Sequence, residues 1–100
     1  MGIRENKVET YLHDRVTETG GTTRKWVSPG RDGVPDRIVI TPWALWFVEV
    51  KTTDGTLSSA QEREHKRLRE AGATVRTVYG HAGVDQLIEE LKNAQTPAAP

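Results

Sequence analysis

The sequence has no cysteine, no long apolar run and no net charge. The absence of cysteine excludes disulfides and thiolate metal sites, and it is consistent with a cytosolic protein. No stretch approaches the ~18 consecutive apolar residues that a membrane span requires, and the N-terminus lacks the apolar core of a signal peptide. With 14 basic and 14 acidic residues, the chain has no overall attraction for nucleic acid. Any polyanion site must therefore depend on a local cluster of basic side chains.

The pattern of apolar residues predicts alternating helices and strands. Helical spacing of apolar residues occurs near both ends of the chain and in its middle. Short β-branched and aromatic runs predict four strands, and the second and third should form an antiparallel hairpin across Pro42-Trp43. The expected elements are a helix at 4–18, strands at 23–27, 36–41 and 44–52, a helix at 58–71, a strand at 73–79 and a helix around 84–91.

This order, α-β-β-β-α-β-α, predicts a single α/β domain with a mixed sheet flanked by helices. The step from the third strand through the second helix to the last strand should be a right-handed parallel crossover. We expect the domain to span residues 1–92. Residues 93–100 are expected to form a disordered tail, because they offer nothing that could pack against the domain.

The predicted strand at 44–52 carries a charged pair among apolar residues. Side chains alternate between the two faces of a strand, so Glu49 and Lys51 point the same way, opposite to Val48 and Val50. A charged pair costs stability in such a strand unless it is neutralised or binds a metal. Taken alone, the pair is better explained as a solvated ion pair at a strand edge.

Asp36 lies where a loop rich in glycine and proline becomes an apolar strand. Pro35 restricts the backbone before it. Across a hairpin that turns near Pro42-Trp43, Asp36 falls opposite Glu49, so two carboxylates and Lys51 converge. Carboxylate oxygens are the ligands that a hard cation such as Mg²⁺ prefers, with other positions left to water and a substrate phosphate. The spacing therefore predicts a metal centre for phosphoryl chemistry.

Three segments resemble a known family of nucleases. GVPDRIVI (33–40), EVK (49–51) and LSSAQEREHKRLREAGATVRTV (57–78) look like the PD-(D/E)XK nucleases. Within them, they resemble the VRR-NUC (virus-type replication-repair nuclease) family, particularly its short stand-alone bacteriophage members. The resemblance extends from Glu5 to about Leu91. It implies a Mg²⁺- or Mn²⁺-dependent endonuclease that hydrolyses DNA, acts on branched DNA such as four-way (Holliday) junctions, and forms homodimers. A phage-encoded member would work in the cytoplasm of a bacterial host.

The resemblance assigns roles to the converging residues. It implies that Asp36 and Glu49 are metal ligands together with the carbonyl of Val50. Lys51 would orient the attacking water or stabilise developing negative charge. The basic residues around the loop are the expected phosphate contacts, because they lie beside the proposed metal. These residues are Arg24, Lys25, Arg31 and Arg37.

The family also has a glutamate on its first helix that approaches the metal through water. This sequence offers Glu5 and Glu9. The helical stripe of Val8, Leu12 and Val16 places Glu5 nearer the inward face, so Glu5 is the first choice and Glu9 the second. Alternatively, both acids only stabilise the positive end of the helix.

Gln61 has two interpretations. Ser58-x-x-Gln61 matches a capping box, in which the glutamine binds the backbone at the start of the helix. The family's matching glutamine lies beside the active site, and we favour that role. His65 lies on the same helical stripe and is interpreted as a residue near the site rather than a ligand.

Two other functions remain open for this sequence. One is a less selective nicking or flap nuclease, because many enzymes share the core motif. The other is a catalytically silent DNA-binding or assembly module, although such a module gains nothing from clustered acids facing phosphate. For a dimer, the candidate apolar surface lies in the three tryptophans and the last helix: Trp26, Trp43, Trp46, Val84, Leu87, Ile88 and Leu91. Alternatively, all of these residues serve one core.

Overall fold

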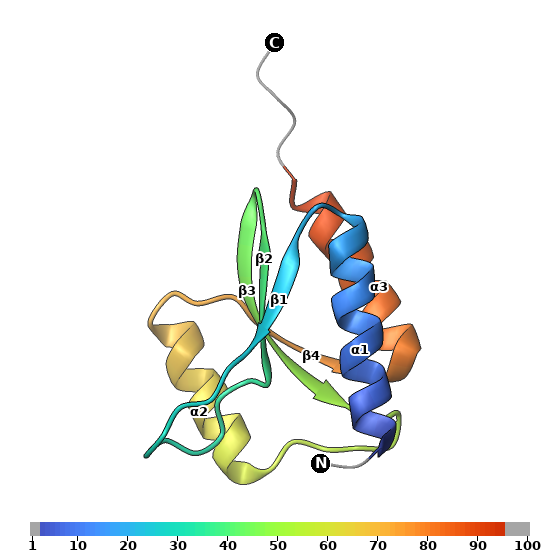
Figure 1. Ribbon diagram of the computed structural model, residues 1–100. Helices are drawn as coiled ribbons and strands as arrows, with labels where there is room; N and C mark the ends of the chain where they lie inside the picture. Colours follow the sequence, from blue (N-terminus) through green and yellow to red (C-terminus); the bar gives the residue numbers. More distant parts are fainter. Residues whose placement is uncertain (1–2, 96–100) are drawn as a thin grey trace.

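Residues 3–95, which the computed structural model describes, form three helices and four strands. Their order is the α-β-β-β-α-β-α order that the sequence predicts. No helix in this range is long and apolar enough to cross a membrane. The elements are α1 (Ile3–Glu18), β1 (Thr22–Lys25), β2 (Arg37–Thr41), β3 (Ala44–Lys51), α2 (Ser59–Glu70), β4 (Val75–Tyr79) and α3 (Gly80–Asn93) (Figure 1).

The four strands form one mixed sheet in the order β1-β2-β3-β4. The pairs β1–β2 and β2–β3 are antiparallel, and β3 and β4 are parallel with α2 between them in the chain. The predicted hairpin and the parallel crossover connection are therefore confirmed. The register pairs Arg37 with Val48, so Asp36, the residue before β2, comes opposite Glu49.

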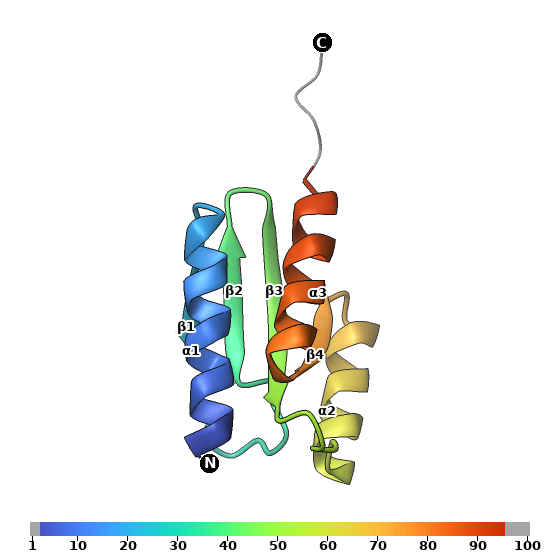
Figure 2. The ribbon, with the colours of Figure 1, turned by 90° about the vertical axis from the view of Figure 1, so that its right-hand side faces the viewer.

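The helices lie on both sides of the sheet. Helices α1 and α3 lie side by side over one face (Figure 2), and α2 packs against β4 on the other side. Val48 and Val50 of β3 point into the core under α1 and α3, where Leu12 and Ile88 are also buried. The alternate residues of β3, Glu49 among them, therefore lie on the opposite face of the sheet.

Several element boundaries differ from the prediction. β1 ends at Lys25, although the backbone N–H of Trp26 still donates to the carbonyl of Asp36 at 2.9 Å. Val27 is 71% exposed and leaves the sheet because the chain turns there into the loop. Helix α3 starts at Gly80, earlier than its apolar stripe indicates. Most of the predicted tail, residues 96–100, lies outside the described residues.

Candidate active site

Asp36 and Glu49 meet at the end of the hairpin that lies away from its turn. The Asp36 side chain accepts a hydrogen bond from the Val50 backbone N–H through Oδ2, at 2.9 Å. The backbone carbonyl of Asp36 accepts a hydrogen bond from the backbone N–H of Trp26. Pro35, the residue before Asp36, is buried. The side chain and the backbone of Asp36 are therefore both held by hydrogen bonds, although the residue lies at the end of a loop.

The loop before Asp36 docks on the start of α2. Gly33 has φ +87°, and a Cβ atom at this position would lie 2.4 Å from the carbonyl oxygen of Ala60. Only glycine allows this approach, because any side chain would collide with the helix backbone. The loop, the end of β3 and the first turn of α2 are therefore held together around Glu49.

Glu49 is buried, with only 2% of its surface exposed. Its Oε2 accepts a hydrogen bond from Gln61 Nε2 at 3.1 Å and lies 3.7 Å from Lys51 Nζ. Its Oε1 has no hydrogen-bond partner within residues 3–95. The nearest ionisable nitrogen to Oε1 is that of His65, whose Nε2 is 3.7 Å away. One carboxylate oxygen is thus satisfied by the protein and the other is left without a partner.

The surroundings of Glu49 disfavour its ionised form. The pKa of Glu49 is raised from 4.5 to about 8, most strongly by burial and then by hydrogen bonding with Asp36 and repulsion from it. Lys51 lowers the pKa and Glu5 raises it, and both effects are smaller. Two acids this close cannot both be charged at neutral pH without a compensating cation. The raised pKa therefore marks a place where a cation would be stabilising.

The residues fit a divalent cation only in part. Within residues 3–95, no three acidic or histidine side chains are gathered as a complete ligand set. Asp36 and Glu49 nevertheless supply two adjacent carboxylates, one of them with an unpartnered buried oxygen. Mg²⁺ is commonly held by one or two carboxylates and keeps several waters. The pair satisfies that requirement, and Glu5 remains a candidate only for contact through water.

The geometric reason for preferring Glu5 over Glu9 is wrong. Glu9 is 2% exposed, whereas Glu5 is only half-buried. Glu9 is tolerated inside because its Oε1 accepts a hydrogen bond from Arg37 Nε at 2.8 Å, a partner that helical periodicity cannot reveal. Glu5 still acts electrostatically on Glu49. Glu9 thus joins α1 to β2, and Glu5 remains the candidate for the site.

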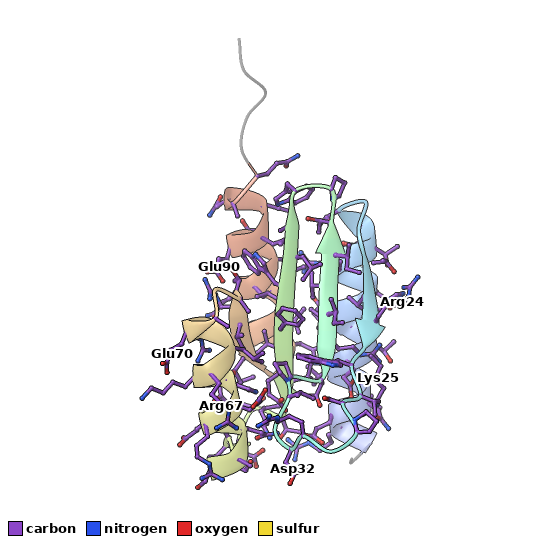
Figure 3. The ribbon with its side chains drawn as sticks, turned by 90° about the vertical axis from the view of Figure 1, so that its left-hand side faces the viewer. Arg24, Lys25, Asp32, Arg67, Glu70 and Glu90 are labelled. Atoms are coloured by element: carbon purple, nitrogen blue, oxygen red, sulfur yellow. The ribbon has the colours of Figure 1, made fainter. Side chains whose placement is uncertain are left out.

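The same ion pair engages Arg37, one of the predicted phosphate contacts. Its Nε donates to Glu9 at 2.8 Å and its side chain is 23% exposed, so a phosphate would have to compete with Glu9 for it. Arg24 and Lys25 lie exposed at the free edge of the sheet (Figure 3). The half-exposed Arg31 has its Nη1 4.0 Å from Glu64 Oε1. These three residues keep their predicted positions beside the loop.

Gln61 combines both of the roles considered for it. Its backbone N–H donates to Ser58 Oγ and its side-chain Oε1 accepts from the Ser58 N–H, which completes the capping box. The amide Nε2 of the same side chain donates to Glu49. The cap therefore fixes the amide that orients the carboxylate.

The raised pKa of Glu49 predicts that the metal-free protein loses stability as the pH rises. Between pH 4.5 and about 8, the folded state holds a proton on Glu49 that the unfolded chain releases. The free energy of unfolding in EDTA should therefore fall across this window, by about 2–4 kcal/mol from this residue. Urea unfolding at pH 5.5 and pH 8 measures the change.

Glu49→Gln should remove most of this loss, because glutamine does not titrate. Glu62→Gln, which changes an exposed acid on α2, should retain it. An equal loss of stability in the wild type and in Glu49→Gln would contradict the assignment.

Similarity to known proteins agrees with this geometry. No family model matches the chain. It is 45% identical over 74 residues to "Putative nuclease p44" of Acyrthosiphon pisum secondary endosymbiont phage 1, covering 73% of this chain and 80% of that protein. A solved structure of a VRR_NUC domain superposes with a TM-score of 0.82 at 41% identity, over 88% of this chain and 97% of that chain.

A second solved structure shares the fold at lower identity. It is described as a VRR_NUC domain protein and has a TM-score of 0.72 at 16% identity, over 95% of this chain and 93% of that chain. The two more similar proteins each exceed 40% identity across most of both chains. The chain therefore belongs to the VRR-NUC family of nuclease domains.

Proposed function

We propose that this protein is a metal-dependent endonuclease that hydrolyses DNA phosphodiester bonds and prefers branched DNA. One observation carries the proposal: Asp36 and Glu49 are adjacent, Glu49 is buried, and one of its oxygens has no partner in the described part of the chain. This arrangement costs free energy in the absence of a cation. Its placement beside Lys51 suits chemistry on a phosphate.

Asp36, Glu49 and the carbonyl of Val50 would hold Mg²⁺ or Mn²⁺. When bound, such an ion lowers the pKa of a water molecule and neutralises phosphate charge. The Val50 N–H holds Asp36, and the Gln61 amide holds Glu49, so both acids are oriented before substrate arrives. Lys51 is largely buried and its ammonium faces Glu49, where it would orient the attacking water or stabilise the negative charge of the transition state.

A catalytically silent DNA-binding module fits these observations less well. Buried acids beside the expected phosphate position would weaken DNA binding, and their burial would serve no purpose. A nicking or flap nuclease would use the same site on other DNA structures. The choice between these substrates depends on how the DNA is held outside the site.

The preference for branched DNA rests on weak attraction for plain duplex. The net charge is zero, and non-specific affinity comes mainly from neutralised phosphates. A dimer with Lys25 and Arg31 beside each site would bind well where the DNA itself presents two strands. A four-way junction does so, and C₂ symmetry would match its two symmetric cuts.

The surface available for a dimer differs from the one predicted. Trp46 and the apolar residues of α3 are in the core, and Trp43 packs against it with its Nε1–H bonded to the Leu91 carbonyl at 2.9 Å. The sheet face away from α1 and α3 carries the exposed Leu45 and the half-buried Phe47, which contacts Trp26. A homodimer would therefore use this face, next to Glu49, rather than α3.

Cleavage of matched substrates tests the proposal. Linear, flap, fork and four-way DNA are incubated with Mg²⁺, Mn²⁺ or EDTA, and the sedimentation mass is measured at micromolar protein. We expect paired cuts on the junction, weaker cleavage of linear DNA, no cleavage in EDTA and the mass of a dimer. Equal cleavage of linear and four-way DNA at moderate salt would contradict the substrate preference and favour a nicking nuclease.

Charge reversal tests the phosphate contacts in the same assay. Lys25→Glu and Arg31→Glu should weaken junction binding more than Lys66→Glu, which changes an exposed lysine on α2. Equal losses in all three variants would show that only the overall charge of the protein matters.

A further inference from the structure

His65 is a fully buried histidine on α2 that the proposed function does not use. Its side chain has 0% exposure, and neither ring nitrogen has a hydrogen-bond partner within residues 3–95. A buried polar atom without a partner lowers the stability of the folded state. An apolar side chain of similar size would fill the same space without that cost. Packing alone therefore does not account for a histidine at this position.

The ring of His65 faces the one oxygen of Glu49 that also lacks a partner. His65 Nε2 and Glu49 Oε1 are 3.7 Å apart, and both atoms are buried. A hydrogen bond between them needs a separation of about 2.7–3.2 Å, so a shift of roughly 0.5 Å would form it. His65 can donate and Glu49 can accept, and neither atom has another partner within residues 3–95. A hydrogen bond between them would therefore satisfy both atoms.

Burial favours the neutral form of the His65 ring, because the side chain has 0% exposure and a buried charge is costly. A neutral imidazole has one N–H and one lone pair. Placing the N–H on Nε2 directs a donor at Glu49, whereas placing it on Nδ1 would direct a lone pair at the same carboxylate oxygen. An ionised Glu49 favours the first arrangement.

We propose that His65 is a positioning residue whose Nε2–H donates to Glu49 Oε1 and holds the ionised carboxylate in the orientation that Mg²⁺ or Mn²⁺ requires. The inference rests on the proposed metal-dependent function. Gln61 already holds Oε2, so the two residues of α2 together fix both oxygens of Glu49. A carboxylate oxygen has two lone-pair directions, and Oε1 can accept from His65 while facing a cation. Groups that orient a metal ligand in this way typically contribute 10–100-fold to metal affinity.

Binding of Mn²⁺ alone, measured by calorimetry without DNA, tests the proposal. His65→Leu has no donor and should weaken Mn²⁺ binding by about 10–100-fold, while the fold remains stable in EDTA because an unpartnered polar group is removed. His65→Gln keeps an amide N–H and should recover most of the affinity. Leu68→Ala is the control: it loosens the packing of the same helix one turn on and should leave Mn²⁺ affinity unchanged.

The outcomes separate this inference from the proposed function. If the wild type does not bind Mn²⁺, the metal site is wrong, and the role of His65 is wrong with it. If the wild type binds and His65→Leu binds equally well, only the role of His65 is overturned. Equal losses in His65→Leu and Leu68→Ala would likewise overturn it, because packing would then explain the effect.

The wild-type protein supplies a test that does not depend on any variant folding. Nitrogen-15 spectra of the imidazole distinguish the two neutral tautomers, and Mg²⁺ can be added because it is diamagnetic. We expect a protonated Nε2 in the Mg²⁺-loaded protein. A proton only on Nδ1 would overturn the proposal, because Nε2 could not then donate to Glu49.

Discussion

Replacement of Asp36 by Asn, or of Glu49 by Gln, should abolish DNA cleavage while DNA binding persists or becomes tighter. Each change removes a carboxylate from the proposed metal site, and metal-assisted stabilisation of several kcal/mol corresponds to at least ~10³-fold in rate. DNA affinity should not fall, because Asp36→Asn removes a negative charge near the phosphate and Glu49, whose pKa is raised to about 8, is largely uncharged without metal at neutral pH. Single-turnover cleavage with Mg²⁺ and fluorescence anisotropy in EDTA measure the two effects separately.

Asp32→Asn is the matched control for Asp36→Asn. Asp32 is an exposed acid in the same loop, four residues before Asp36 (Figure 3). The Asp32→Asn variant should cleave at close to the wild-type rate, because Asp32 takes no part in the hydrogen bond between Asp36 and Val50. Cleavage at near wild-type rate by Asp36→Asn or Glu49→Gln would remove both residues from the active site.

The sequence predicts the arrangement of the backbone well because the relevant signals are local. Alternation along 44–51 and the turn at Pro42-Trp43 determine the hairpin register. That register brings Asp36 opposite Glu49 without any knowledge of the remaining fold. The converging carboxylates could thus be predicted from spacing alone.

The side-chain partners could not be predicted in the same way. The burial of Glu9 depends on Arg37, 28 residues later, and neither periodicity nor helix-end electrostatics contains that pairing. The environment of His65 depends equally on Glu49, which lies on another element. The two roles of Gln61 are compatible because its side-chain amide has two polar ends. The oxygen accepts a hydrogen bond from Ser58, and the nitrogen donates one to Glu49. Long-range polar contacts, unlike the secondary structure, therefore cannot be predicted from local sequence patterns.

The exposed apolar surface could not be predicted from the sequence either. Three tryptophans and an amphipathic helix predict more apolar area than a small core needs, but not which part remains exposed. The structure places Trp46 and α3 in the core and leaves Leu45 exposed on the sheet. The difference arises because α1 and α3 together cover one sheet face, whereas α2 packs against β4 and the end of β3 on the other and leaves Leu45 exposed.

Lys51→Ala should reduce turnover by about 10²–10⁴-fold, the usual range for loss of one charge-stabilising or proton-handling group. Only 14% of the Lys51 side chain is exposed, and its Nζ lies 3.7 Å from Glu49 Oε2. Its removal should leave Asp36 and Glu49 in place, so Mn²⁺ affinity should change much less than turnover. This separates Lys51 from the metal ligands, whose substitution should affect both quantities.

Lys51→Arg and Lys66→Ala complete the test of Lys51. Arginine keeps the positive charge but spreads it over a planar group, so Lys51→Arg should recover only part of the turnover. Lys66→Ala removes an exposed lysine of α2 and should leave turnover unchanged. If Lys51→Ala cleaves within a few-fold of the wild type, or loses Mn²⁺ affinity in proportion to turnover, then Lys51 does not act on the reacting phosphate. The Lys51–Glu49 contact would in that case serve only to neutralise a buried acid.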